Sequence, residues 1–185
     1  MTAIAGYVKD GRIWLGGDRA GTTDCDLIHT TQPKVFHLRD SKLVIGYAGS
    51  YRLGQVVQYA LVPPVCASKN DFEYLFRFCN TLRDLVKEYG AIESKDSFER
   101  VVDWGSLIVG YNSQLYTVHS NFTFTQSRLP YIADGCGAKT VNGAFHAMEM
   151  IHDIAPEVRV KWALEAAEMH NVHVKGPFDI IRTGE

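Results

Sequence analysis

The sequence predicts an α+β fold, and two kinds of pattern support this prediction. Short apolar runs bounded by glycine, proline or Asp-Gly turns indicate strands, and longer segments with apolar residues every three or four positions indicate helices. Strands come first, followed by two helices, more strands, two further helices and a final strand. A four-layer αββα sandwich would produce this order, and the chain length predicts a single domain over residues 1–185.

The N-terminal third is expected to consist of strands. Gly16 and Gly17 lie directly before Asp18, and glycine in a strand lets another chain segment approach closely. The first two strands flank an Asp-Gly turn, which is a hairpin signature, and the fourth leads into a helix. The four predicted strands are residues 2–8, 13–17, 34–38 and 42–50.

Two helices are predicted in the middle of the chain. The first should end before Pro63, and the second should begin at the Asn70-Asp71 cap and end near Gly90. Residues 91–100 are polar and charged, which predicts a mobile connecting loop. The apolar residues expected to face the core are Leu53, Val56, Val57, Ala60 and Leu61 in the first helix, and Phe72, Leu75, Phe76, Cys79, Leu82 and Val86 in the second.

The C-terminal half repeats the alternation of strands and helices. A hairpin is predicted around Asn112-Ser113, with strands over 101–111 and 114–119, and a further strand over 128–133. A last strand is expected over 178–181. Of the two intervening helices, the second begins with Pro156 in its first turn. Their inward residues are expected to be Val141, Phe145, Met148 and Ile151, and then Val158, Trp162 and Ala166.

Thr2 is the strongest candidate for a catalytic residue. Its small side chain favours removal of Met1, and a terminal threonine carries its own base, because its α-amine has a reference pKa of about 8. A buried lysine nearby would lower that pKa further. Asp18 and Lys34 follow Thr2 after sixteen and thirty-two residues. Taken one at a time, Thr2, Asp18 and Lys34 could equally be a strand terminus, a turn residue and a surface charge.

Several short motifs accompany these three residues. A Thr-x-apolar-x-Gly run begins at Thr2, Gly-Gly-Asp ends at Asp18, Lys34 is followed by valine, and Gly-x-Ala-Gly-Ser covers residues 46–50. With these spacings the chain resembles the proteasome β-subunit and bacterial HslV family of N-terminal threonine peptidases. Residues 107–111 resemble the central strand of that family, and residues 133–137 resemble its Gly-Ser-Gly turn before a helix. The resemblance implies the N-terminal nucleophile hydrolase fold, a four-layer αββα sandwich.

The resemblance also implies a mechanism and an assembly. Thr2 would attack a peptide carbonyl, Lys34 would supply positive potential, Asp18 would orient Lys34, and the Gly49 N–H would stabilise the oxyanion. The expected functional unit is a homo-oligomeric ring that admits unfolded polypeptides or peptides, and an ATP-dependent unfoldase is a candidate partner. Aromatic residues near Lys34 and Gly49 predict an apolar substrate pocket lined by Phe36, Tyr47 and Tyr51.

Three positions depart from the family pattern. Cys136 occupies the place of the serine between two glycines, and a thiol is a weaker hydrogen-bonding group. Asn171 and Val174 stand where the family commonly has an aspartate and a serine. These differences leave two alternatives open: an N-terminal nucleophile amidase acting on a small amide, and a catalytically silent assembly subunit.

Composition restricts the remaining function classes. A net charge of −2 and a pI near 6.4 give no electrostatic reason to expect a nucleic acid or an anionic membrane as partner. The four cysteines, Cys25, Cys66, Cys79 and Cys136, have neither metal-ligand spacing nor an obvious disulfide framework, so no metal or cofactor is expected. Without a signal peptide or a long apolar run, the sequence predicts a soluble, cytoplasmic protein.

Overall fold

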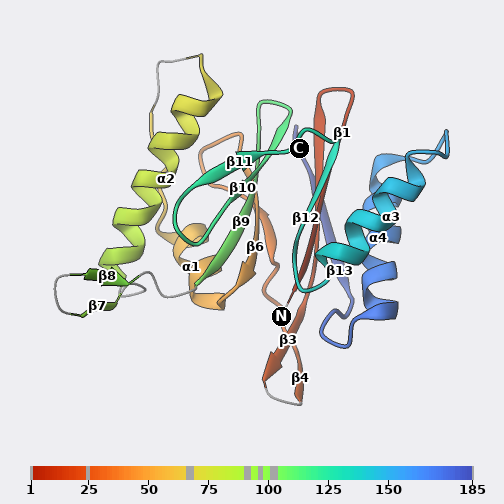
Figure 1. Cartoon of the computed structure of the whole chain (residues 1–185), viewed down its shortest axis with the longest axis horizontal. Helices are drawn as coiled ribbons and strands as arrows, with labels where there is room; N and C mark the ends of the chain where they lie inside the picture. The colour runs from red at the N-terminus through yellow and green to blue at the C-terminus, as the bar shows by residue number, and fades with distance from the viewer. Residues whose placement is uncertain are drawn as a thin grey trace.

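The computed structural model of the chain has four layers, in which two facing sheets are covered on their outer sides by helices (Figure 1). The structure describes residues 2–23, 26–65, 69–89, 93–95, 98–100 and 104–184. The α+β prediction is confirmed, and so is the predicted order of the main elements. Among the described residues, no helix combines the length and apolar character needed to cross a membrane.

One inner layer is an antiparallel sheet of four strands that carries Thr2 at one end. Its order is β12-β1-β2-β13, so the N-terminal hairpin lies in the centre and the C-terminal strand lies at an edge. Thr2 immediately precedes β1, and Asp18 is the last residue of β2. The strands are β1 (Ala3–Lys9), β2 (Arg12–Asp18), β12 (Tyr131–Gly135) and β13 (Phe178–Arg182).

The second inner layer is an antiparallel sheet of five strands in the order β11-β10-β9-β6-β5. Lys34 directly precedes β5, and Gly49 ends β6. The strands are β5 (Val35–His37), β6 (Val44–Gly49), β9 (Gly105–Tyr111), β10 (Gln114–Val118) and β11 (Phe124–Gln126). Each sheet thus has strand ends next to predicted site residues, Thr2 and Asp18 in one sheet and Lys34 and Gly49 in the other. These strand ends lie at the same end of the molecule.

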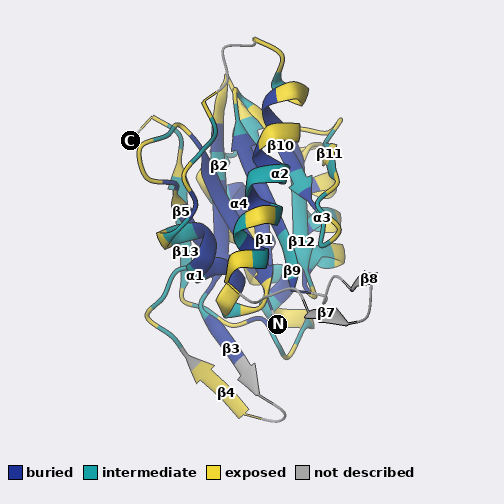
Figure 2. Ribbon diagram, turned by 90° about the vertical axis from the view of Figure 1, so that its left-hand side faces the viewer, coloured by how far each residue is buried: buried dark blue, intermediate teal, exposed yellow. Residues whose placement is uncertain are grey.

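The helices cover the outer faces of the two sheets. Side-chain caps start two of them, since Ser50 accepts from the Arg52 N–H and Asn70 accepts from the Phe72 N–H. Helices α1 (Tyr51–Tyr59) and α2 (Asp71–Glu88) cover the five-stranded sheet, and α3 (Ala138–Met148) and α4 (Pro156–His170) cover the other (Figure 1). Buried residues accordingly form three clusters, one under each helix pair and one between the sheets. Figure 2 shows the buried residues concentrated in the central strands.

Two short hairpins complete the described structure. Strands β3 (Ala20–Thr23) and β4 (Asp26–His29) form a hairpin that projects from the body near the N-terminus (Figure 1). It was not predicted from the sequence. Of the connector expected over residues 91–100, the structure describes only β7 (Glu93–Lys95) and β8 (Phe98–Arg100), and the remainder lies outside the described residues.

The predicted inward face of α2 is partly wrong. Leu75, Cys79, Leu82 and Val86 are buried as expected, but Phe72 and Phe76 are 53% and 63% exposed. Tyr74 and Phe78 are buried in their place, so the buried stripe is rotated on the helix relative to the prediction. The α2 sequence has apolar side chains over too wide an arc for periodicity to identify the inward side.

The predicted inward face of α4 is wrong as well, and α3 ends earlier than expected. Trp162 is 49% exposed, Val158 and Ala166 are only partly buried, and Ile151 lies beyond α3 and is 52% exposed. Gly16 of β2 explains the orientation of α4, because a Cβ at Gly16 would overlap the side chains of Val160 and Leu164. The helix therefore packs closely on the sheet through a different face. Its buried residues are Arg159, Val160, Ala163, Leu164 and Ala167.

Candidate functional site

A buried ion pair joins the end of β2 to the start of β5. The Lys34 Nζ lies 3.1 Å from both carboxylate oxygens of Asp18, and it also donates to the Ala20 carbonyl at 2.5 Å. The amides of Ala3 and Ala20 donate to the two Asp18 oxygens at 2.9 and 3.1 Å. Each Asp18 oxygen thus receives two donors, so the carboxylate is fixed in one orientation.

The environment of this pair acts on the pKa of both groups. The side chains of Lys34 and Asp18 are 2% and 0% exposed. Burial lowers the pKa of Lys34, and the charge of Asp18 opposes that effect. Burial also raises the pKa of Asp18, opposed by the Lys34 ammonium and by the amides of Ala3 and Ala20. The bidentate contact and the donors around it identify a lysine ammonium held at the sheet end.

Thr2 is held against the turn between β12 and α3. The Gly137 N–H and the Cys136 thiol both donate to the Thr2 carbonyl oxygen at 3.3 Å. Gly135 has a φ of +87°, and a Cβ there would overlap the Thr2 carbonyl. Only glycine suits this position, because it adopts positive φ at little cost and leaves room for the threonine. The Ala3 amide, next along the chain from Thr2, contacts Asp18.

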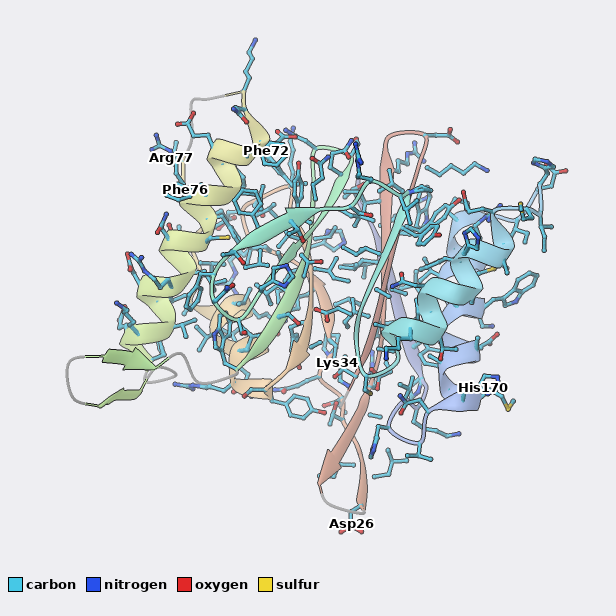
Figure 3. The ribbon with its side chains drawn as sticks, viewed as in Figure 1. Asp26, Lys34, Phe72, Phe76, Arg77 and His170 are labelled. Carbon is cyan, nitrogen blue, oxygen red and sulfur yellow. The ribbon has the colours of Figure 1, made fainter. Side chains whose placement is uncertain are left out.

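A cavity of about 350 Å³ opens beside Thr2. Small residues from both sheets line it, so the space is suited to a polypeptide backbone. In Figure 3 Lys34 lies at the end of the sheets from which β3 and β4 project. The lining residues are Thr2, Ala48, Gly49, Gly105, Ser106, Gly135 and Cys136.

The Gly49 N–H points toward the edge of β6 on which Lys34 lies. A Cβ at Gly105 would overlap the Ala48 carbonyl oxygen, which therefore points toward β9. Because C=O and N–H of a trans peptide point in opposite directions, the Gly49 N–H points away from β9. On that edge the Tyr47 N–H, two residues earlier, donates to the Lys34 carbonyl at 3.0 Å. Gly49 thus lines the cavity with an N–H that points away from β9.

The three departures from the family pattern have different positions. Cys136 lines the cavity and contacts the Thr2 carbonyl. Asn171 donates to the Cys136 carbonyl at 3.0 Å, and its own side-chain oxygen accepts from the His173 N–H at 3.0 Å. Val174 is buried under the helices. Asn171 thus supports the turn on which Thr2 packs, a role that its position in the sequence does not indicate.

The predicted aromatic substrate pocket is not formed at this cavity. Phe36 and Tyr47 are 6% and 3% exposed and lie in the buried layer under α1 and α2. Successive strand residues point to opposite faces, so Tyr47 points away from the face on which Ala48 lines the cavity. Tyr51 packs on Tyr47, with ring centroids 6.4 Å apart. None of these three is among the described residues that line the cavity.

Four residues near the predicted site were not predicted from the sequence. Ala20 holds both members of the ion pair through its backbone, and Arg19 connects Asp18 to Ala20. Ser106 lines the cavity from β9. Asp134 has a buried Oδ2 without a hydrogen-bond partner in the described structure. The one local signal for any of them in the sequence is that Arg19 and Ala20 directly follow the predicted site residue Asp18.

Within the described ranges, no group of histidine, cysteine, aspartate or glutamate side chains is placed to hold a metal ion. Cys79 and Cys136, the two cysteines that the structure describes, are free thiols, and Cys79 is buried. Burial raises the pKa of the Cys79 thiol to about 12. The side-chain groups that line the cavity are the hydroxyls of Thr2 and Ser106 and the Cys136 thiol, and neither Lys34 nor Asp18 is among the described lining residues. The ion pair instead lies behind the Ala3 amide, next to Thr2.

No family model and no curated protein matches the sequence. The fold is similar to solved structures at low identity. BPH, a bacterial proteasome homologue from Thiobacillus denitrificans, matches with a TM-score of 0.80 at 18% identity over 98% of this chain and 97% of that one. A second BPH structure, in complex with epoxomicin, has a TM-score of 0.78 at 17% identity over 98% and 97%.

Two other proteins share the fold. Eukaryotic HslV from Trypanosoma brucei matches with a TM-score of 0.68 at 19% identity over 97% of this chain and 98% of that one. Anbu, an ancestral β-subunit from Yersinia bercovieri, matches with a TM-score of 0.69 at 14% identity over 98% and 81%. The chain has the N-terminal nucleophile hydrolase fold of these proteasome-like proteins, as the sequence resemblance predicted.

Proposed function

We propose that this proteasome-like chain is a threonine peptidase subunit in which Thr2, once Met1 is removed, is the nucleophile. The observation that carries the proposal is the buried Lys34 ammonium, held by Asp18 beside the strand that begins after Thr2. An ion pair that only stabilised the fold would not need a cavity near it. Here Thr2, whose neighbour Ala3 donates to Asp18, lines a cavity. The combination of a hydroxyl, a fixed cation and an open space fits acyl transfer.

The mechanism uses groups already in place. The Thr2 hydroxyl attacks the scissile carbonyl carbon, and its proton passes to the free α-amine. The amine then protonates the departing nitrogen, which leaves an ester between the substrate acyl group and Thr2. Water, deprotonated by the same amine, hydrolyses this ester and regenerates the hydroxyl. Lys34 lowers the pKa of the amine through its charge, and the Gly49 N–H stabilises the oxyanion.

The first experiment replaces the nucleophile. Thr2→Ala should lower peptide hydrolysis by several orders of magnitude and keep the fold, with a loss of stability of about 1 kcal/mol because the deleted hydroxyl and methyl belong to a buried residue. Thr2→Ser, which retains a hydroxyl, is the matched control and should keep measurable activity. Intact mass should show that active protein lacks Met1. Full activity in Thr2→Ala, or in protein that retains Met1, would exclude the mechanism.

Epoxomicin provides a second test of the same site, because it is the ligand in one of the BPH structures. We expect it to inhibit hydrolysis and to raise the melting temperature of the wild-type protein. The Thr2→Ala variant should show a smaller shift. An equal shift in both would place the binding elsewhere.

We also propose that the chain works as a homo-oligomeric ring that hydrolyses unfolded polypeptides or peptides. The similarity of fold to HslV, BPH and Anbu supports this proposal. The cavity supports the substrate class, because small residues surround it and leave space for an extended backbone. An ATP-dependent unfoldase would be needed only if folded proteins were the natural substrates.

A further inference from the structure

Arg19 occupies the single position between β2 and β3. Its guanidinium forms a two-pronged ion pair with Asp179 of β13, with Nε to Oδ2 at 2.7 Å and Nη2 to Oδ1 at 2.5 Å. The two side chains are 32% and 20% exposed, so the pair is partly shielded from water. A bidentate ion pair fixes the orientation of the guanidinium relative to the carboxylate as well as the distance between them.

The backbone of Arg19 is held from a different direction. Its carbonyl oxygen accepts from the Thr30 N–H at 3.3 Å and from the Thr30 hydroxyl at 3.1 Å. Thr30 follows β4 and leads toward Lys34. Arg19 therefore links three segments that meet at the site: the end of β2, the approach to β5, and the edge strand β13.

The contacts of Arg19 affect the backbone position of Ala20, the next residue. Its carbonyl accepts from the Lys34 ammonium, and its amide donates to Asp18. Any rotation of the chain at Arg19 would move both groups, because they belong to the two peptide units on either side of Ala20. The β3–β4 hairpin, which projects from the body, begins at Ala20, and Ala20 itself is buried (Figure 1).

We propose that Arg19 and Asp179 are positioning residues for the Lys34–Asp18 pair, holding the Ala20 carbonyl against the Lys34 ammonium. The catalytic consequence rests on the proposed peptidase function, but the effect on Lys34 does not. The largest charge effect on Lys34 is that of Asp18. Loss of the Ala20 acceptor weakens stabilisation of the ammonium, so the pKa of Lys34 falls.

The test measures titration of Lys34 directly, by NMR of protein labelled at lysine Cε and assigned with Lys34→Met. Arg19→Met and Asp179→Asn should both lower the titration midpoint of Lys34. Arg19→Lys keeps the positive charge but loses the bidentate geometry, so the Lys34 midpoint in this variant should lie between those of Arg19→Met and the wild-type protein. Arg77→Met, which removes an arginine from an ion pair with Glu73 on α2, is the control and should leave the midpoint unchanged (Figure 3).

Kinetics form the second arm of the experiment. Arg19→Met should lower kcat about tenfold with little change in KM, and the alkaline limb of the rate profile should move to lower pH. A midpoint that moves in an inactive protein would support the positioning role and count against the peptidase proposal. An unmoved Lys34 midpoint in folded Arg19→Met and Asp179→Asn protein would overturn the inference, whatever the activity.

Discussion

At the scale of single residues, the site depends on the balance of charges around one buried carboxylate. Asp18 has four hydrogen bonds, two from the Lys34 ammonium and two from backbone amides. Removal of the Asp18 charge and removal of the Lys34 charge should have unequal effects on stability. Each group loses its counter-ion when the other is removed, but the Asp18 carboxylate keeps the amide donors of Ala3 and Ala20, one on each oxygen, whereas the Lys34 ammonium keeps the neutral Ala20 carbonyl in place of a carboxylate.

This asymmetry leads to a prediction for two variants. Asp18→Asn should cost about 3–5 kcal/mol of stability, because it leaves the buried Lys34 ammonium without its counter-ion. Lys34→Met should destabilise less but should reduce hydrolysis by several orders of magnitude. Denaturant unfolding and peptide kinetics are the measurements, and Glu73→Gln, at the exposed pair on α2, is the control.

The double variant Lys34→Met/Asp18→Asn tests the coupling between the two groups. Its loss of activity and of stability should be smaller than the sum of the two single losses, because one interaction is removed twice. Additive losses would show that Asp18 and Lys34 act independently, and the proposed mechanism would then need a different source of positive charge.

At the scale of elements, the site is assembled from segment ends rather than from segment interiors. Thr2 precedes β1, Asp18 ends β2, Lys34 precedes β5, and Gly49 ends β6. The fifth element is the turn from Gly135 to Gly137, which holds the Thr2 carbonyl. Segment ends leave backbone N–H and C=O groups free of sheet pairing, so these groups can bind the side chains of the candidate site.

Asn171 provides the test at this scale. Asn171→Ala removes the donor to the Cys136 carbonyl and the acceptor for the His173 amide, so the turn under Thr2 should loosen. We expect about 1 kcal/mol of destabilisation and a fall in kcat of about tenfold or less. Asn80→Ala is the matched control, because Asn80 makes an amide-to-carbonyl bond to Phe76 on α2. Equal kinetic effects in the two variants would show that Asn171 has only a general role in stability.

At the scale of the whole molecule, the two sheets place the cavity at one end of the interface between them. The helices on both outer sides cover the sheet faces, so under the proposed function a substrate would reach Thr2 through the open end. Such an entrance does not select substrates by shape. Selection by enclosure would require several copies of the chain arranged around a common space.

The size of the native particle checks this expectation. Light scattering at micromolar concentration should give a mass several times that of the 20.7 kDa chain. A panel of fluorogenic peptides should be hydrolysed, and folded proteins should not be. A monomer that hydrolyses folded proteins would contradict the enclosed-ring proposal, and one that acts on a single small amide would favour the amidase alternative.

The sequence by itself determined the fold class, most strands and helices, and the spacing of Thr2, Asp18 and Lys34. The α+β class and the individual elements depend on local patterns of apolar residues, turns and caps, whereas the four-layer arrangement and the roles of the three residues came from the resemblance to the proteasome β-subunit and HslV family. The spacing was informative because the hairpin of β1 and β2 returns Asp18 to the level of Ala3. In this register the Ala3 amide donates to the Asp18 carboxylate at 2.9 Å.

The tertiary structure alone decided which helix faces are buried, where the aromatic side chains point, and how the ion pair is held. Gly16 selects the inward face of α4, and strand alternation turns Tyr47 away from the cavity. The contact between Arg19 and Asp179 joins residues far apart in the chain, so no local pattern contains it. The physical reason is that burial and pairing depend on which surfaces meet, and periodicity describes one segment at a time.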